Sequence, residues 1–147
     1  MEGHSGQMQE QTLTYQTLAK AGFVKTVCET GFNAGHSALL FLSTKADIHV
    51  YSFDLGSHSY GQPMAALLQK TFPGRLNVTW GDSKVTVPAF AKSHPDIKCD
   101  IIIVDGGHNY REAKADLRNL RALAGKNYNI LIIDDHPSNT LPGVKKA

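Results

Sequence analysis

The sequence has few of the residues and runs that mark several specialised classes of protein. Its 147 residues include only two cysteines, Cys28 and Cys99, too few and too far apart for a disulfide framework or a Cys-x-x-Cys site. We expect both to be buried, reduced thiols, and the chain to be cytoplasmic. No apolar run approaches the roughly 18 residues of a membrane span, and the N-terminus has no apolar signal core. The net charge of +2 is too small to bind nucleic acid through bulk electrostatics. We therefore expect no membrane and no nucleic-acid partner.

Several motifs are also absent, and each absence argues against one chemistry. The phosphate-cradling pattern Gly-x-x-x-x-Gly-Lys-Ser/Thr does not occur. In the glycine-rich segment from Gly31 to Gly35, Asn33 stands where a dinucleotide fingerprint has its second glycine. This side chain disfavours a close approach of pyrophosphate. Residues 35–37 lack the second glycine of a nucleophile elbow, which argues against a serine hydrolase.

The composition that remains is that of one globular domain. The hydrophobic share is 41% and the charged share 19%, both ordinary for a soluble fold with a real core. We expect a disordered tail over 1–7 and a single domain over 8–147. Apolar residues at helical spacing predict a leading helix over 8–21.

Strand and helix patterns then alternate. We predict strands over 25–29, 48–53, 76–80, 100–105 and 129–134, and helices over 35–42, from Pro63 to before Phe72, over 86–92 with Pro88 in the first turn, and from Asn109. The last two strands are continuous apolar runs, which predicts burial on both faces, whereas the third alternates and fits a sheet edge. The sequence therefore predicts an α/β fold: a doubly wound, Rossmann-like parallel sheet of order 3-2-1-4-5 with helices on both faces. Ligands bind such sheets where the first and fourth strands separate.

Acidic residues stand at the ends of the predicted strands. Asp54 follows the second strand and can accept both hydrogen bonds of a ribose diol. Asp82, followed by Ser83, can accept from an adenine amino group. Each also has an alternative interpretation as a helix cap or a loop acid. Together they indicate a nucleotide-type site along one edge of the sheet.

The ends of the fourth and fifth strands carry a second group of candidates. His108 can act as a general base near neutral pH, or bond structurally to loop backbone. Asp105, Asp134 and Asp135 can converge as a hard-oxygen site for Mg²⁺ or Ca²⁺. The alternative is that these acids cap loops and meet no metal.

These segments resemble motifs of class I S-adenosylmethionine-dependent methyltransferases, in an O-methyltransferase-like branch. The likeness to the first motif spans 29–37, that to the second-strand acidic motif 51–55, and that to the adenine-contacting segment 81–83. Residues 103–110 and 132–135 match the fourth and fifth strand ends of this branch. The resemblance covers about 23–136 and implies transfer of a methyl group to an oxygen of a small-molecule acceptor.

The resemblance also implies residue roles. The cofactor-binding residues would be Glu29, Gly31, Asn33, Gly35, His36, Ser37, Asp54, Leu55, Asp82, Ser83 and Asp105. Asp105 would lie near the sulfonium and the acceptor, and is a catalytic candidate together with His108. In metal-dependent relatives two acids and an amide bind Mg²⁺. Asp105 and Asp134 match the acids, and Asp135 stands where the amide would be, which leaves the choice of metal open.

One departure from the family concerns the end of the chain. The family usually adds a sixth strand and an antiparallel seventh, but only about a dozen residues follow Asp135. We therefore expect either a C-terminally truncated domain or a homodimer that covers the open edge of the fifth strand. Two alternatives to methyl transfer remain: a non-catalytic cofactor-binding or dimerising module of the same fold, and an NAD-dependent oxidoreductase.

Overall fold

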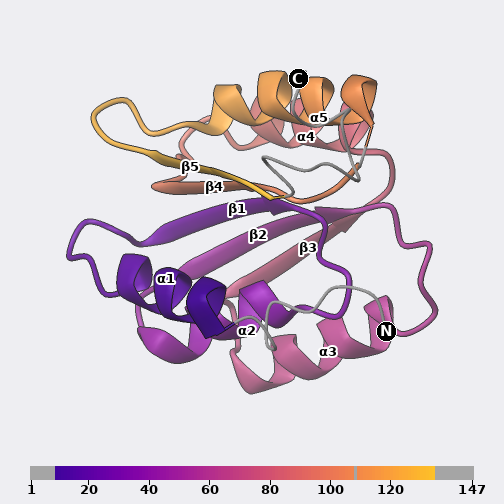
Figure 1. Cartoon of the computed structure of the whole chain (residues 1–147). Helices are drawn as coiled ribbons and strands as arrows, with labels where there is room; N and C mark the ends of the chain where they lie inside the picture. Colours follow the sequence, from indigo (N-terminus) through magenta and orange to yellow (C-terminus); the bar gives the residue numbers. More distant parts are fainter. Residues whose placement is uncertain (1–8, 108, 135–147) are drawn as a thin grey trace.

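The computed structural model describes residues 9–107 and 109–134, and within them strands and helices alternate (Figure 1). The strands are β1 (Thr26–Thr30), β2 (His49–Asp54), β3 (Leu76–Trp80), β4 (Ile101–Val104) and β5 (Ile130–Ile133). The helices are α1 (Gln9–Ala19), α2 (His36–Thr44), α3 (Gly61–Thr71), α4 (Ser83–Ser93) and α5 (Tyr110–Leu120), with a short 3-10 helix, η1 (Arg121–Leu123), after α5. The predicted elements are confirmed, with shifted ends.

The strands form one parallel sheet in the order β3-β2-β1-β4-β5. β1 lies at the centre, where Cys28 aligns with Tyr51 of β2 and with Ile102 of β4. This confirms the predicted order. It also places the switch point between β1 and β4, because the chain leaves β1 toward β2 and later returns to its other side.

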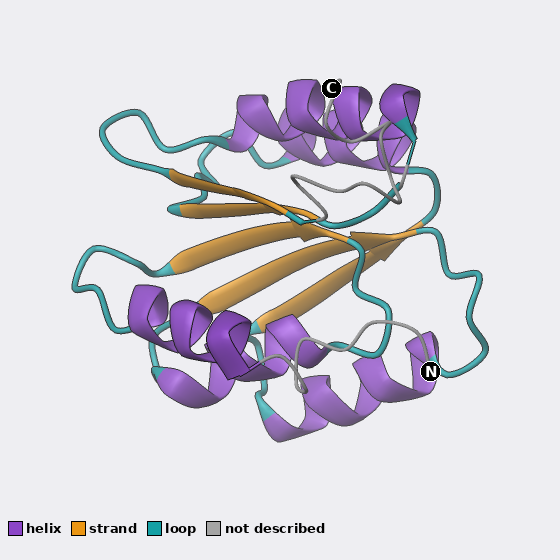
Figure 2. Cartoon of the chain, viewed as in Figure 1, coloured by secondary structure: helices purple, strands orange, loops and turns teal. Residues whose placement is uncertain are grey.

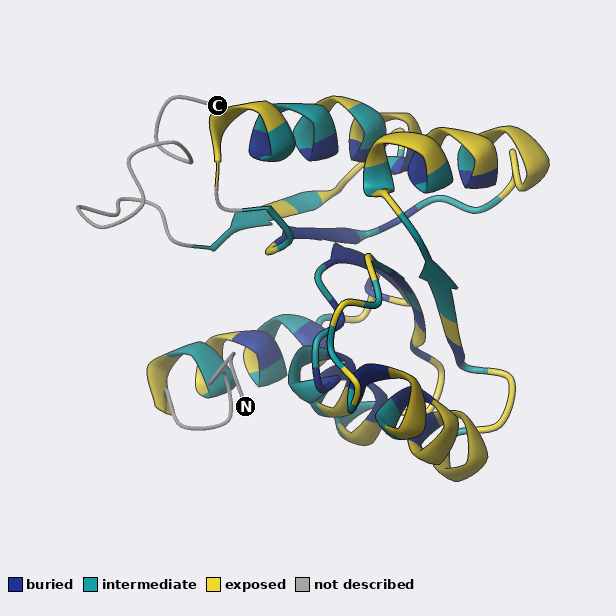
Figure 3. Ribbon diagram, turned by 90° about the vertical axis from the view of Figure 1, so that its right-hand side faces the viewer, coloured by how far each residue is buried: buried dark blue, intermediate teal, exposed yellow. Residues whose placement is uncertain are grey.

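Helices cover both faces of the sheet, as predicted (Figure 2). Successive strand residues point to opposite faces, so Val27 joins one core and Cys28 the other. The first core lies under α1, α2 and α3, and the second under α4, α5 and η1. Figure 3 shows the buried side of each helix turned toward the sheet and the exposed side turned outward.

Two local expectations were wrong. α4 begins at Ser83 because the Asp82 side chain caps it by accepting from the Lys84 N–H at 2.9 Å, and Pro88 therefore lies beyond the first turn. A proline is tolerated there because both it and Lys84 are exposed, so the carbonyl that loses its helical donor can meet water. β5 is not buried on both faces: Leu131 is 50% exposed, since β5 is paired with β4 on one side only among the described residues.

Some expectations cannot be compared with the structure. The predicted tail over 1–7 and the residues after Asp134 lie outside the described ranges. Among the described helices, none combines the length and the apolar character that crossing a bilayer requires.

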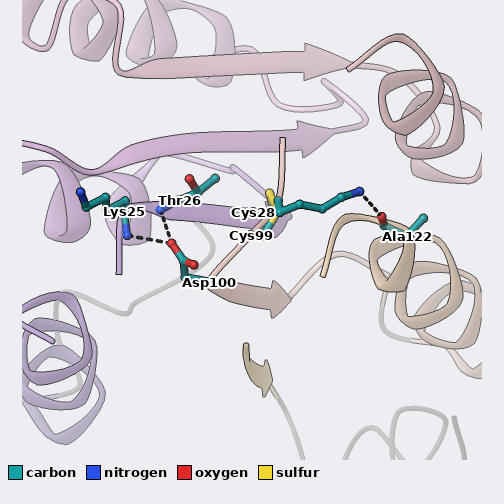
Figure 4. Close-up of a disulfide and its surroundings, with 7 residues drawn as sticks. Lys25, Thr26, Cys28, Cys99, Asp100 and Ala122 are labelled. Atoms are coloured by element: carbon teal, nitrogen blue, oxygen red, sulfur yellow. Dashed lines mark hydrogen bonds between the residues drawn. A yellow bond between two sulfur atoms is a disulfide. The ribbon is translucent and has the colours of Figure 1, made fainter. Parts of the chain in front are cut away.

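The two cysteines form a disulfide, which corrects the expectation of reduced thiols (Figure 4). Both are fully buried, as predicted. They are 71 positions apart in sequence, yet their Cα atoms are 5.8 Å apart, within the usual range for a disulfide. The error came from judging separation along the chain. The parallel topology brings Cys99, two residues before β4, next to β1, and only the folded order of strands reveals that approach.

We predict that the disulfide contributes several kcal/mol to stability. Closing a loop of this length lowers the entropy of the unfolded chain, so reduction should lower the free energy of unfolding by roughly 2–4 kcal/mol. Denaturant unfolding with and without a reductant measures the difference, and the Cys28→Ala/Cys99→Ala double variant controls for effects of the reductant itself. Thiol titration of the unreduced, denatured chain should find no free thiol, and two free thiols per chain would contradict the disulfide.

Candidate functional site

The acidic candidates lie at one edge of the sheet, as predicted. Glu29 is the penultimate residue of β1, Asp54 is the last of β2, and Asp105 and Asp134 directly follow β4 and β5. Because all the strands are parallel, these positions share the carboxyl edge. Asp82 comes after β3 at the same edge.

The turn between β1 and α2 is shaped by contacts within the chain. Gly31 has a φ of +89°, and a Cβ added there would lie 2.1 Å from the carbonyl oxygen of Asp105. Gly35 has a φ of +76°, and its missing side chain leaves room for the ring of Phe32. These glycines are thus required for packing the turn against the residues after β4 and against Leu68 of α3. Gly35 is the N-cap residue of α2 and provides no side-chain cap for the N–H groups of the first turn.

Asp54 is bound to this turn by backbone hydrogen bonds. Asn33 has a left-handed backbone, with a φ of +50°, and its N–H donates to Asp54 Oδ2 at 2.9 Å. The N–H of Gly56 donates to Asp54 Oδ1 at 2.7 Å. Each carboxylate oxygen has further lone pairs, so Asp54 is oriented by the chain and can still accept from a ligand.

A tyrosine that the sequence analysis missed completes this corner. The Tyr60 hydroxyl donates to Asn33 Oδ1 at 2.8 Å, and the Tyr60 ring stacks on His58 with centroids 5.0 Å apart. No spacing rule indicates this contact, because it joins two loops of irregular structure. Leu55, the residue after Asp54, is 68% exposed and so leaves an apolar surface next to Asp54.

Glu29 is a buried acid held by two serines. It is 1% exposed, and its two carboxylate oxygens accept from Ser37 Oγ at 2.6 Å and from Ser52 Oγ at 2.5 Å. Burial raises the pKa of Glu29 to about 7, against the lowering effect of both serine hydrogen bonds. Ser52 was missed, although a serine inside the apolar second strand was a usable signal.

The segment after β3 has a structural role at the start of α4. Asp82 caps α4 and forms an ion pair with Lys84, 3.3 Å between Nζ and Oδ2. The hydrogen bond from the Lys84 N–H is the main reason that the pKa of Asp82 is lowered. The capping alternative is therefore confirmed for Asp82. Ser83 donates to Asp116 of α5 at 2.6 Å, a residue that the sequence analysis missed.

The ends of β4 and β5 bring two acids side by side. The Asp134 N–H donates to the Val104 carbonyl at 3.1 Å, which continues the β4–β5 ladder and aligns Asp134 with Asp105. Tyr15 of α1, also missed, is 3% exposed and stacks on Phe41. Burial raises the pKa of Tyr15, and the charges of Asp134, Asp105 and Glu29 raise it further. α1 therefore places a phenol near the acids of the switch point.

The structure does not describe the predicted base or the third predicted metal ligand. His108 and Asp135 lie outside the described residues. Within 9–107 and 109–134, no group of three or more His, Cys, Asp or Glu side chains is arranged to hold a metal ion.

We predict that ionisation of Glu29 destabilises the fold. Its folded pKa of about 7 lies above the ordinary value of 4.5. The stability contributed by the protonated acid is therefore complete below the ordinary value and is lost as the pH rises through about 7. The free energy of unfolding of Glu29→Gln, relative to that of the wild type, should therefore increase by roughly 3 kcal/mol between acid and mildly alkaline pH.

Denaturant unfolding at several pH values measures this difference. Glu10→Gln, on the exposed side of α1, controls for the loss of one negative charge. A difference between Glu29→Gln and wild type that stays constant with pH would contradict the assignment.

Known proteins share this arrangement of strands and helices. Among solved structures, the chain is similar to CalS11, a TDP-rhamnose 3′-O-methyltransferase of calicheamicin biosynthesis, with 18% identity, a TM-score of 0.75, and coverage of 92% of this chain and 66% of that one. It is similar to the O-methyltransferase TomG from Streptomyces achromogenes, in complex with SAM (16% identity, TM-score 0.72, 93% and 65% coverage). It is also similar to an O-methyltransferase from Bacillus cereus in complex with SAH (14% identity, TM-score 0.72, 94% and 66% coverage). At these identities the likeness shows the fold.

The chain spans about two thirds of the length of these solved structures. No curated protein sequence matches it. A family model described as a methyltransferase domain matches residues 28–136, a range that runs from the middle of β1 to beyond β5 and includes the turn, Asp54, the Asp82–Ser83 segment and the acids of the switch point. The chain therefore belongs to the methyltransferase domain family.

Proposed function

We propose that the chain is an S-adenosylmethionine-dependent methyltransferase that methylates an oxygen of a small molecule. One observation carries the proposal: the turn after β1 and the acid that ends β2 form a single hydrogen-bonded unit, through the Asn33 N–H and Asp54 Oδ2. This unit offers a carboxylate beside uncapped helix-start N–H groups. Solved structures of similar fold include O-methyltransferases in complex with SAM and SAH.

The residues at this edge fit such a cofactor. Asp54 is fixed by two backbone donors and keeps acceptor capacity for a ribose diol. Leu55 is an exposed leucine that an adenine ring can cover. Asn33 carries a side chain where a pyrophosphate would need open backbone, which disfavours the NAD-dependent alternative. The Gly81 N–H donates to the Asp54 carbonyl at 2.8 Å, which supports a role for the following Asp82–Ser83 segment beside the base.

When bound, the cofactor supplies a methyl group on a positively charged sulfur. The chain's own contribution is to hold donor and acceptor in line and to take the acceptor's proton. Asp105, exposed at the end of β4, and His108 are the candidates for that proton. The Glu29 carboxyl group accepts hydrogen bonds from the Ser37 and Ser52 hydroxyls. These bonds hold the end of β1 to β2 and to the first turn of α2.

We also propose that a divalent metal binds at the ends of β4 and β5. Asp105 and Asp134 are aligned at the ends of neighbouring strands, and two carboxylates suit Mg²⁺ or Ca²⁺. The described residues provide two acids and no third ligand, so a metal would take Asp135 or other groups in addition.

Dimerisation and cellular location are further proposals. Pairing of two copies through the edge of β5 would cover Leu131, which is half exposed. A cytoplasmic location is likewise a proposal, and the disulfide between Cys28 and Cys99 takes away the support that reduced thiols would give it.

We predict that Asp54→Ala abolishes binding of S-adenosylhomocysteine. The change removes two charge-assisted hydrogen bonds to the ribose, so affinity should fall at least roughly 100-fold in calorimetry. Because Asp54 also holds two backbone N–H groups, Asp54→Asn is measured beside it, and thermal unfolding of each variant reports folding. Asp47→Ala, an exposed aspartate in the preceding loop, is the matched control.

The same sample separates the rival functions. Tighter binding of NAD than of S-adenosylhomocysteine would favour the oxidoreductase. Cofactor binding without methyl transfer to any small-molecule hydroxyl would favour the non-catalytic module, and light scattering then reports whether it dimerises.

We predict that any dependence of activity on a divalent metal is lost in Asp134→Ala. The variant should show the same rate in Mg²⁺ and in chelator, because one of the two aligned carboxylates is gone. If the wild-type chain is equally active in chelator and in Mg²⁺, the metal proposal is wrong.

A further inference from the structure

Asp116 is a buried acid in the middle of α5, outside the residues proposed to contact the cofactor or the acceptor. It is 1% exposed, and the ion pairs of the described residues do not include it. Burial raises the pKa of Asp116, and the nearby acids Glu112 and Asp82 raise it further. Burying a carboxyl among acids is costly, so its polar contacts call for an explanation.

One oxygen of Asp116 holds the start of α4. Ser83 Oγ donates to Asp116 Oδ1 at 2.6 Å, and Ser83 directly follows the cap residue Asp82. This contact ties α5 to the segment that follows β3, across 33 positions of sequence.

The other oxygen faces the ends of β1 and β4. A Cβ added at Gly106 would lie 2.9 Å from Asp116 Oδ2 and 3.2 Å from the Cβ of Thr30. The Thr30 hydroxyl is buried and makes no hydrogen bond of good geometry within the described residues, although its nearness favours the ionised carboxyl of Asp116. The absence of a side chain at Gly106 thus makes the space that Asp116 and Thr30 occupy.

We propose that Asp116 is a positioning residue for the cofactor site: it fixes the Asp82–Ser83 segment relative to the ends of β1 and β4, and so sets the affinity for the nucleoside. The three segments that it joins carry Gly31, Asp105 and Ser83, all candidate cofactor residues. Asp116 itself lies on the α4–α5 side of the sheet and acts through them. The inference rests on the proposed function.

A matched pair of acids separates positioning from simple stabilisation. Asp100 also binds the chain through its carboxylate, accepting from the N–H groups of Lys25 and Thr26 at 2.8 and 2.9 Å, but at the opposite edge of the sheet. Asp116→Ala should weaken binding of S-adenosylhomocysteine about tenfold, the worth of one charged hydrogen bond. Asp100→Ala should lower the melting temperature and leave the affinity within about twofold of wild type.

Conservative and indirect variants complete the test. Asp116→Asn keeps an oxygen for Ser83 and should restore most of the affinity, which also covers the case that Asp116→Ala does not fold. Gly106→Ala places a methyl group against Asp116 Oδ2 and should reproduce the loss. Gly22→Ala, where an added Cβ meets nothing within 4 Å, is its control.

The outcomes distinguish this inference from the proposed function. Suppose that the wild type binds S-adenosylhomocysteine. If Asp116→Ala and Asp100→Ala then bind it with equal affinity, whether high or low, Asp116 only stabilises the fold and the inference is wrong. If the wild type itself does not bind the ligand in calorimetry, the proposed function fails, and the inference falls with it.

Discussion

The contact between the ends of β1 and β4 is the constraint on which the rest of the site depends. Gly31 turns the chain with a positive φ and brings its backbone so close to the Asp105 carbonyl that no side chain fits between them. The Gly31 N–H donates to the Phe53 carbonyl at 2.9 Å, so β2 is held by the same residue. Three strand ends therefore meet at one glycine, and the acids that follow them have fixed positions before any ligand arrives.

The acids of this edge are already engaged by the chain. Asp54 accepts from two backbone N–H groups, Glu29 from two serines, and Asp82 from the start of α4. A carboxylate held in this way has little side-chain freedom left to lose when a ligand binds. Under the proposed function the same groups carry structural and binding roles, and capping does not by itself argue against a functional role.

The sequence was sufficient for the fold because periodicity decides it. Apolar runs and helical spacing located the elements, and the alternation of β3 identified an edge strand, which was enough to order the sheet. The same local rules misplaced the start of α4, since a side-chain cap from Asp82 outweighed the expected limit set by Pro88. They also overstated the burial of β5, because an apolar strand at an edge has the same pattern as a central one.

The candidate residues could be predicted where motif spacing marks them, and not where side chains come together only in the fold. Gly31, Asn33 and Asp54 follow from motif spacing. Tyr60 reaches Asn33 across 27 positions and Ser83 reaches Asp116 across 33, and no periodicity encodes such contacts. For Asp116 a signal existed: it is a charged residue on the inner stripe of α5, beside Ala113 and Leu120.

The cross-link between Cys28 and Cys99 has a topological consequence for the sheet. The covalently closed macrocycle from one cysteine to the other contains α2, β2, α3, β3 and α4, and with them the exposed segment around Leu55. A single proteolytic nick in that segment would open the macrocycle without releasing either fragment, since both would remain tethered through sulfur. Under the proposed function, the segment that binds the nucleoside thus lies inside the macrocycle, and its cleavage would leave both fragments joined.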